Sequence, residues 1–199
     1  EEWPDLLAAL PDFNEQLVRF GAVLVHYRSQ FTARLNEYAA MHHRECSGGR
    51  EVLEVRYQTV SAVTERASEL SVLTGQRRRA MGAHETAGRA SRLCLSGPHK
   101  DDLCVTMDGR DAKSYASQGQ TRTAALALKL AEREIYKNAT GEYPVLLLDD
   151  VLSELDERRQ NFVLERIGGG QVFITCCEDD KQIAQDGRRF TVRSGRLTR

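Results

Sequence analysis

The apolar residues between positions 10 and 38 recur every three or four residues along the chain. This spacing places them on one face of a helix, so it predicts one long helix with an apolar seam. Pro11 and Asp12, with Glu15 three residues later, predict that a capping box starts the helix, and the glycines of residues 47–49 predict its end. The seam consists of Leu10, Phe13, Leu17, Phe20, Leu24, Tyr27, Phe31, Leu35 and Tyr38.

A strand and a second helix are predicted next. Apolar and polar residues alternate over positions 53–59, which is typical of a strand with one buried face. A helix is predicted for residues 62–81, followed by a glycine-containing and basic loop at 82–92. The apolar stripe of this helix is Val63, Ala67, Leu70 and Leu73. Two helices around a strand predict an arm packed as an antiparallel pair, although an ordinary helical core subdomain explains the pattern equally well.

The second half of the chain has the pattern of an α/β fold. Residues 145–148 are four consecutive apolar residues, which predicts a central strand of a parallel sheet that is covered on both faces. In such a sheet, chemistry is expected at the carboxyl end of the strand. The other predicted elements are a strand (103–107), a hairpin turn at Asp108 and Gly109, a returning strand (111–115), a helix (121–136), a helix (157–167) and a strand (171–175).

Two short motifs carry candidate chemistry. Asp149 and Asp150 end the apolar strand, where one carboxylate can bind Mg²⁺ and the other can orient water. Taken alone, this pair is typical of a helix cap or surface turn. Residues 117–120 open a long helix, whose unpaired N–H groups form an anion site that Gly119 lets a ligand approach closely. Taken alone, this motif also predicts only a helix cap. Its residues are Ser117, Gln118, Gly119 and Gln120.

Together, and in this order, the motifs resemble those of a known protein family. Residues 117–123, 146–150 and 153–156 resemble the signature loop, Walker B strand and D-loop of an ABC-type ATPase. With Gly-Pro-His-Lys-Asp-Asp-Leu at residues 97–103, the chain resembles the RecF family of bacterial recombination mediators, which are related to SMC-type ATPases. The resemblance implies a partial ABC-type P-loop ATPase lobe with a mixed or parallel sheet in residues 91–199, and an inserted helical arm subdomain in residues 1–90.

The resemblance also implies roles for individual residues, with ATP and Mg²⁺ as cofactors. Residues 117–120 would contact ATP held by the opposite subunit of a dimer, Asp149 would bind Mg²⁺, and Asp150 would be the catalytic carboxylate. Many ABC ATPases have glutamate at this last position, so the shorter aspartate implies looser water positioning and slow turnover. Ser153 and Asp156 would lie at the dimer seam, where Asp156 can also cap the following helix.

Two further regions stay without a firm role. Transporter-type ABC ATPases place a histidine after the next strand, but Thr175, Cys176 and Cys177 stand in that region here. No residue is therefore assigned as the γ-phosphate sensor. His99 and Lys100 lie in the RecF-like segment, near the nucleotide or simply in a turn, and no second histidine supports a zinc site there.

The implied function is that of a DNA-binding ATPase. RecF-like proteins are expected to dimerise with ATP on single-stranded or gapped DNA and to help load recombinase, together with mediator proteins, at damaged replication sites. The associated processes are DNA replication, recombinational repair and the SOS response. Because no Gly-x-x-x-x-Gly-Lys-Ser/Thr segment occurs in the sequence, we expect a part of a longer protein that does not hydrolyse ATP by itself.

Two other functions compete with this one. The first is an SMC-like scaffold or association module that does not hydrolyse ATP and in which the acidic strand is vestigial. The second is a metal-dependent nuclease that uses Asp149, Asp150 and Asp156, although the sequence offers no further ligands at suitable spacing.

Composition and charge change this picture little. With 199 residues and 41% apolar residues the chain can bury a core, and its net charge of −1 gives no overall signal for nucleic acid. The basic runs are either solvated surface or DNA phosphate contacts; the candidates are Arg77, Arg78, Arg79, Arg188 and Arg189. The 5 cysteines lack metal-ligand spacing and predict free thiols in a reducing cytosol. No signal peptide or long apolar span is visible, so we expect a cytoplasmic protein without a membrane partner.

Overall fold

A computed structural model describes residues 3–59, 69–153, 155–176 and 187–198 of the chain, with side chains from residue 8 onward. Its helices are α1 (Trp3–Ser47), α2 (Leu70–Ser91), the 3-10 turn η1 (Pro98–Lys100), α3 (Ala112–Tyr115), α4 (Gln118–Thr140) and α5 (Glu157–Arg166). Its strands are β1 (Leu53–Gln58), β2 (Asp102–Met107), β3 (Arg110–Asp111), β4 (Leu146–Asp149), β5 (Val172–Thr175), β6 (Thr191–Arg193) and β7 (Arg196–Thr198). None of the described helices is long and apolar enough to cross a membrane.

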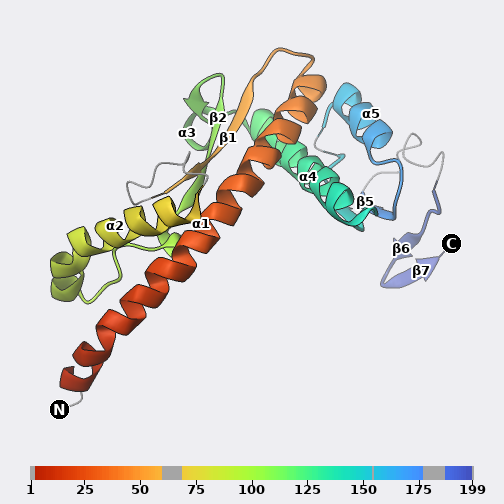
Figure 1. Cartoon of the computed structure of the whole chain (residues 1–199). Helices are drawn as coiled ribbons and strands as arrows, with labels where there is room; N and C mark the ends of the chain where they lie inside the picture. The colour runs from red at the N-terminus through yellow and green to blue at the C-terminus, as the bar shows by residue number, and fades with distance from the viewer. Residues whose placement is uncertain (1–2, 60–68, 154, 177–186, 199) are drawn as a thin grey trace.

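The long helix α1 runs obliquely from the lower left of Figure 1 to its top, and the C-terminal elements lie to its right. Its predicted start at Asp12 is wrong, because α1 begins at Trp3 and passes through Pro11. A proline inside a helix removes one backbone hydrogen bond and crowds the carbonyl four residues earlier. The helix nevertheless continues on both sides of Pro11. The predicted end is confirmed: Gly48 follows with φ 69°, a left-handed conformation that glycine adopts without strain.

The predicted apolar seam of α1 is largely exposed, which corrects the sequence interpretation. Phe13, Phe20, Leu24, Tyr27 and Phe31 are all exposed. The buried face is instead lined mainly by smaller residues, which let neighbouring elements approach the helix axis closely. These residues are Val18, Ala22, Val25 and Ala39, and Leu35 of the predicted seam is buried with them. Leu24 is 45% exposed, so a charge placed there would not be buried by helix pairing.

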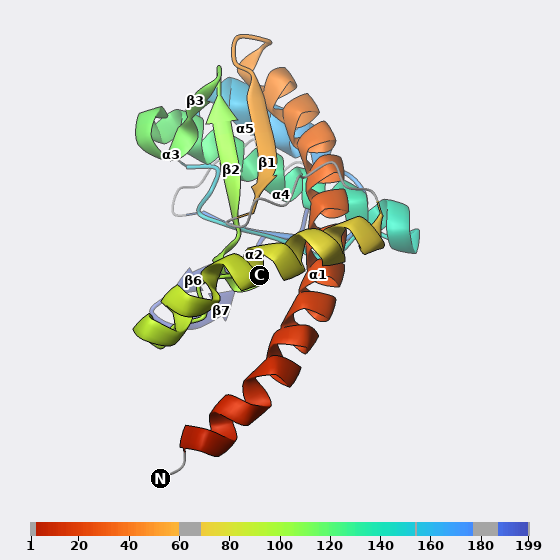
Figure 2. The same cartoon turned by 60° about the vertical axis from the view of Figure 1, so that its left-hand side comes forward.

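Helix α2 crosses α1 obliquely, and the first half of α1 extends beyond the crossing (Figure 2). Leu73 packs there against Ala22 and Val25. The part of the predicted second helix at residues 60–68 lies outside the described residues. The predicted loop at 82–92 is wrong, because α2 continues to Ser91 and Arg92 ends it with φ 56°. Glycine lowers helix stability only by about 1 kcal/mol, so the glycines at 82 and 88 do not stop it.

An antiparallel sheet of order β1-β2-β3 lies against α1 and α4. The predicted turn is confirmed: Asp108 and Gly109 have φ 51° and 77°, as a two-residue hairpin requires. The predicted returning strand over 111–115 is mostly wrong. Strand β3 ends at Asp111, whose side chain accepts a hydrogen bond from the Ser114 N–H and starts α3.

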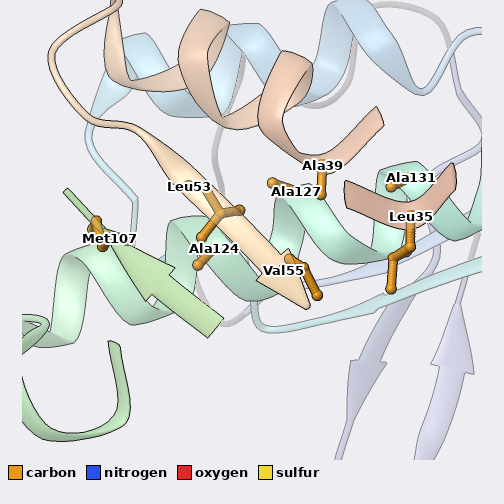
Figure 3. Packing of buried hydrophobic residues seen from close by; sticks show 8 residues of the cluster. All are labelled: Leu35, Ala39, Leu53, Val55, Met107, Ala124, Ala127 and Ala131. Carbon is orange, nitrogen blue, oxygen red and sulfur yellow. The ribbon is translucent and has the colours of Figure 1, made fainter. Parts of the chain in front are cut away.

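The main core joins elements from both halves of the chain. Leu35 and Ala39 of α1, with Leu53 and Val55 of β1, pack on the alanine-rich face of α4 (Figure 3). The α4 and β2 side of this core is Met107, Ala124, Ala127 and Ala131. The division at residue 90 stays a prediction, and the core residues come from both sides of it.

Strands β4 and β5 form a parallel pair, as predicted. Leu146 and Leu148 are buried beneath α4 and α5. The predicted cover on the second face is wrong for the described residues, because Leu147 is 70% exposed and Phe173 on β5 is 52% exposed. Within the described chain, helices pack on one face of this pair only.

The hairpin of β6 and β7 was not predicted from the sequence, and neither were η1 and α3. Ser194 and Gly195 form its turn with φ 49° and 75°. All residues of both strands are exposed.

The described cysteines Cys46, Cys94, Cys104 and Cys176 are free, as expected.

Candidate nucleotide and DNA site

The carboxyl end of β4 presents an oriented carboxylate. Asp149 is the last residue of β4 and lies in register with Thr175 at the end of β5. The Thr175 hydroxyl donates to Asp149 Oδ1 at 2.5 Å, while the aspartate remains exposed. The parallel pairing thus places a hydroxyl where it fixes the direction of the carboxylate. Thr175 was not identified as a site residue, since its partner lies far away in sequence and only strand register joins them.

Asp150 turns sharply out of the strand. Its φ of 53° is a left-handed conformation that is uncommon for a residue other than glycine. Its N–H donates to the Thr175 carbonyl oxygen at 3.1 Å and lies 3.0 Å from the Thr175 hydroxyl. The Ser153 hydroxyl donates to Asp150 Oδ1 at 2.7 Å, so the carboxylate is held within the turn. Asp149 and Asp150 therefore have different partners and orientations.

Residues 117–120 form a complete capping box at the start of α4. The Ser117 Oγ accepts from the Gln120 N–H at 3.3 Å, and Gln120 Oε1 accepts from the Ser117 N–H at 2.9 Å. Two N–H groups of the first turn, at Gln118 and Gly119, lie between these bonded ends. N–H groups at this position have no partner within a helix and favour an anion.

The loop before α5 approaches the start of α4 through one arginine. Asp156 caps α5 by accepting from the Arg159 N–H at 3.0 Å. The Arg159 guanidinium lies 3.4 Å from Asp156 Oδ2, and its Nη1 lies 3.5 Å from the point where a Cβ of Gly119 would be. Arg159 thus lies between the D-loop-like and signature-like segments. The sequence analysis did not single it out, although its spacing from the capping aspartate is a usable signal. Glu154 of the same motif lies outside the described residues.

The two motifs stay separate within one chain. In the part of the chain that the structure describes, no hydrogen bond or ion pair joins residues 117–120 to Asp149 or Asp150. The described residues also contain no group of three or more histidine, cysteine or acidic side chains that could hold a metal. A metal at Asp149 would therefore need ligands from outside this set, such as water or phosphate oxygens.

The arginines predicted to contact DNA differ in exposure. Arg77 is 3% exposed, and burial lowers the pKa of its guanidinium, while Asp101 and Tyr57 act in the opposite direction. Arg78 is exposed and pairs with Glu15 at 2.5 Å. The exposed ones are Arg78, Arg79, Arg188 and Arg189.

A cavity of about 480 Å³ lies beside the middle of α1, away from both motifs. The Tyr57 hydroxyl donates to Asp101 Oδ2 at 2.5 Å within it, and burial, followed by this hydrogen bond, raises the pKa of Tyr57 to about 12. Arg28 Nη1 donates to the Pro98 carbonyl oxygen at 2.6 Å. His99 lines the same cavity, so the structure gives it neighbours other than the β4 carboxylates.

The chain is similar to individual proteins of known sequence, although no model of a known protein family matches it. The DNA replication and repair protein RecF of Symbiobacterium thermophilum is 42% identical over 188 residues, which cover 92% of this chain and 50% of that protein. RecF of Bacillus subtilis is 40% identical over 191 residues, with 94% and 51% covered. The chain spans about half the length of the curated relatives it matches.

The fold matches as well. A solved structure of the recombination mediator protein RecF-ATP in the RecFOR pathway superposes with a TM-score of 0.80 at 33% identity, over 96% of this chain and 50% of that one. The structure of RecF-ATPrS gives the same values. The α/β ABC-type ATPase class predicted from the sequence is confirmed by this agreement.

Proposed function

We propose that this chain, which is similar to RecF proteins over nearly its whole length, supplies the signature and Walker B parts of an ATP-dependent DNA-binding protein. The observation that carries the proposal is the parallel β4–β5 pair, which ends in a carboxylate oriented by a hydroxyl of the neighbouring strand. That arrangement suits a metal-bound phosphate at the carboxyl end of a sheet.

Asp149 is the proposed Mg²⁺ ligand. Mg²⁺ prefers oxygen ligands and keeps several waters, so one or two carboxylates together with substrate phosphates are sufficient. Asp149 fits this requirement, because one of its oxygens accepts from Thr175 and the side chain is exposed. When bound, the metal would neutralise phosphate charge.

Asp150 is the proposed catalytic carboxylate. Its hydrogen bond from Ser153 holds it within the turn after β4, from where it can orient a water toward the γ-phosphate. The short side chain and this bond limit its reach, which supports slow hydrolysis.

The start of α4 is proposed to contact ATP that is bound to a second subunit. Its exposed N–H groups suit a γ-phosphate, and Gly119 lets the phosphate approach. The absence of bonds between this segment and Asp149 in the described chain supports two half-sites that come from different subunits. Ser153 and Asp156 would then lie at the seam of the homodimer, with Arg159 linking Asp156 to Gly119.

DNA is the proposed polymer ligand, as single strands or gapped duplex, in the cytoplasm. Arg78, Arg79, Arg188 and Arg189 are exposed cations suited to phosphate contacts, so affinity should fall with salt. The protein is further proposed to help load recombinase together with other mediator proteins, during replication, repair and the SOS response. A nuclease is disfavoured, because Asp156 is occupied as a helix cap and no cluster of three acidic ligands occurs among the described residues.

The test joins this chain to the Walker A lobe of a RecF relative and measures ATP turnover and ATP-dependent dimerisation. We expect slow turnover in the joined protein and none in the chain alone. Asp150→Asn should abolish turnover but keep dimerisation, whereas Ser117→Arg should prevent dimerisation. Turnover that survives both changes would show that hydrolysis does not use these residues, and no turnover in the joined protein would favour the scaffold that does not hydrolyse ATP. Turnover by the chain alone would refute the division of labour.

A further inference from the structure

A hydrogen-bonded chain connects the end of α1 to the start of α4. Glu51 lies between α1 and β1, and each of its carboxylate oxygens has a different partner. Glu51 Oε2 lies 3.0 Å from His43 Nε2 on α1, and Glu51 Oε1 accepts from Gln120 Nε2 at 3.0 Å. Gln120 in turn accepts from the Ser117 N–H at 2.9 Å. Four residues thus link the long helix to the signature-like loop.

Glu51 determines how the Gln120 amide is oriented. An ionised carboxylate has acceptors only, so the NH₂ group of Gln120 must face Glu51. The amide oxygen of Gln120 then faces the Ser117 N–H and closes the capping box. Without Glu51 only the Ser117 N–H would hold the amide in this orientation, because a rotated amide would place its NH₂ group against that donor.

The anchor of this chain of bonds is buried. The side chain of His43 is 0% exposed and that of Glu51 is 17% exposed. Burial lowers the pKa of His43, with Glu51 and Asp108 opposing and the Arg159 charge adding to the decrease. Hydrogen bonds to a charged group are stronger than neutral ones and gain further strength away from water. The loop is held from inside the protein as well, because the Thr123 hydroxyl donates to the Gly119 carbonyl oxygen at 2.8 Å.

We propose that Glu51 is a positioning residue for the signature-like loop: it orients Gln120, which holds the Ser117 backbone, and His43 ties this arrangement to α1. The proposal rests on the proposed function of residues 117–120. It follows that a displacement of the end of α1 changes the geometry of the loop that meets the nucleotide. Glu51 itself touches no nucleotide.

The first test needs no ATP. In this chain, hydrogen exchange at the Ser117 amide reports directly on the bond that Glu51 is proposed to preserve. Glu51→Ala should speed this exchange about tenfold, since a hydrogen bond to a charged group is lost from the chain of bonds. Glu54→Ala is the matched control, because Glu54 pairs with Arg56 at the surface of β1 and should leave the exchange unchanged. Equal exchange in wild type and Glu51→Ala would overturn the proposal.

The second test uses the protein joined to a Walker A lobe. Glu51→Ala and Gln120→Glu should each weaken ATP-dependent dimerisation about tenfold, while the affinity of the monomer for ATP stays unchanged. Gln120→Glu places two carboxylates together, and adding Glu51→Gln restores one donor between them, so the double variant should recover dimerisation. If Glu51→Ala does not fold, the double variant Glu51→Gln, Gln120→Glu tests the proposal by itself. A folded double variant that does not recover ATP-dependent dimerisation refutes the proposal.

The outcomes also separate this inference from the proposed function. A wild-type protein that does not dimerise with ATP would refute the proposed function alone, because the Ser117 exchange still tests Glu51. Normal dimerisation by all the variants would refute the positioning role and leave the proposed function intact.

Discussion

Arg133, in the middle of α4, donates a hydrogen bond to the carbonyl oxygen of Ile167, just beyond the end of α5, at 3.1 Å. The same guanidinium also donates to the carbonyl oxygens of Arg166, Gly168 and Gly169. It therefore satisfies carbonyl groups that the end of a helix leaves without partners. This single side chain fixes α4 to the segment between α5 and β5.

Arg133→Met should destabilise the chain strongly. Arg133 is 2% exposed, so its removal would leave several carbonyl groups without a donor, which we expect to lower the free energy of unfolding by about 2 to 4 kcal/mol. Urea titration followed by circular dichroism measures this. Lys129→Met, which removes an exposed cation one turn earlier on α4, is the control. A change no larger than that of the control would show that the carbonyl groups find other partners.

Substitution by aspartate should destabilise the protein strongly at Val25 of α1 and only weakly at the neighbouring Leu24. Val25 is 0% exposed and packs with Ala22, Tyr57 and Leu73. Val25→Asp would bury an unpaired charge and should lower the free energy of unfolding by about 3 to 5 kcal/mol. Leu24→Asp, on the exposed face, should change it by less than about 1 kcal/mol. Thermal unfolding of both variants checks this, and the reverse order would mean that the exposed face is the one that packs.

Acid should weaken the fold through His42, which is 3% exposed. Burial lowers its pKa, the Arg166 charge adds to this, and Glu134 and Glu45 oppose it. A histidine whose pKa is lower in the folded state contributes full stability above its unfolded pKa of about 6.5, and this is lost as the pH falls below that value. His42→Leu should flatten the loss of melting temperature between pH 7 and 5. An identical slope in His42→Leu and in the exposed-site variant His84→Gln would contradict this.

Thr175 should tune the use of Mg²⁺ in the protein joined to a Walker A lobe. Thr175→Val keeps the shape of the side chain but removes the donor to Asp149. We expect half-maximal ATP turnover to require about tenfold more Mg²⁺, a size typical of losing a partner that orients a metal ligand. Thr175→Ser keeps the hydroxyl and should restore the wild-type requirement. An unchanged Mg²⁺ requirement in Thr175→Val would mean that Asp149 needs no such orientation.

Local sequence signals predicted the elements near the candidate site well. The capping residues Ser117 and Asp156 begin α4 and α5 at the expected positions, and Asp108 with Gly109 forms the expected turn. These features depend on residues only a few positions apart, so the sequence contains the whole cause. The prediction of a loop at 82–92 was wrong, because it rested on the glycines alone. The residues around them favour a helix, and α2 continues to Ser91.

From the sequence alone, periodicity determined that α1 is a long helix, and an unbroken apolar run determined that β4 is a strand ending in two carboxylates. The order of the motifs gave the resemblance to an ABC-type ATPase. Only the tertiary structure decided which stripe of α1 is buried, because Val25 and Leu24 are both apolar and the choice depends on what packs against them. Likewise, Thr175 reaches Asp149 through strand register, and Glu51 reaches Gln120 through the packing of α1 on α4. Contacts between residues distant in sequence depend on the summed packing of the fold, which no local pattern contains.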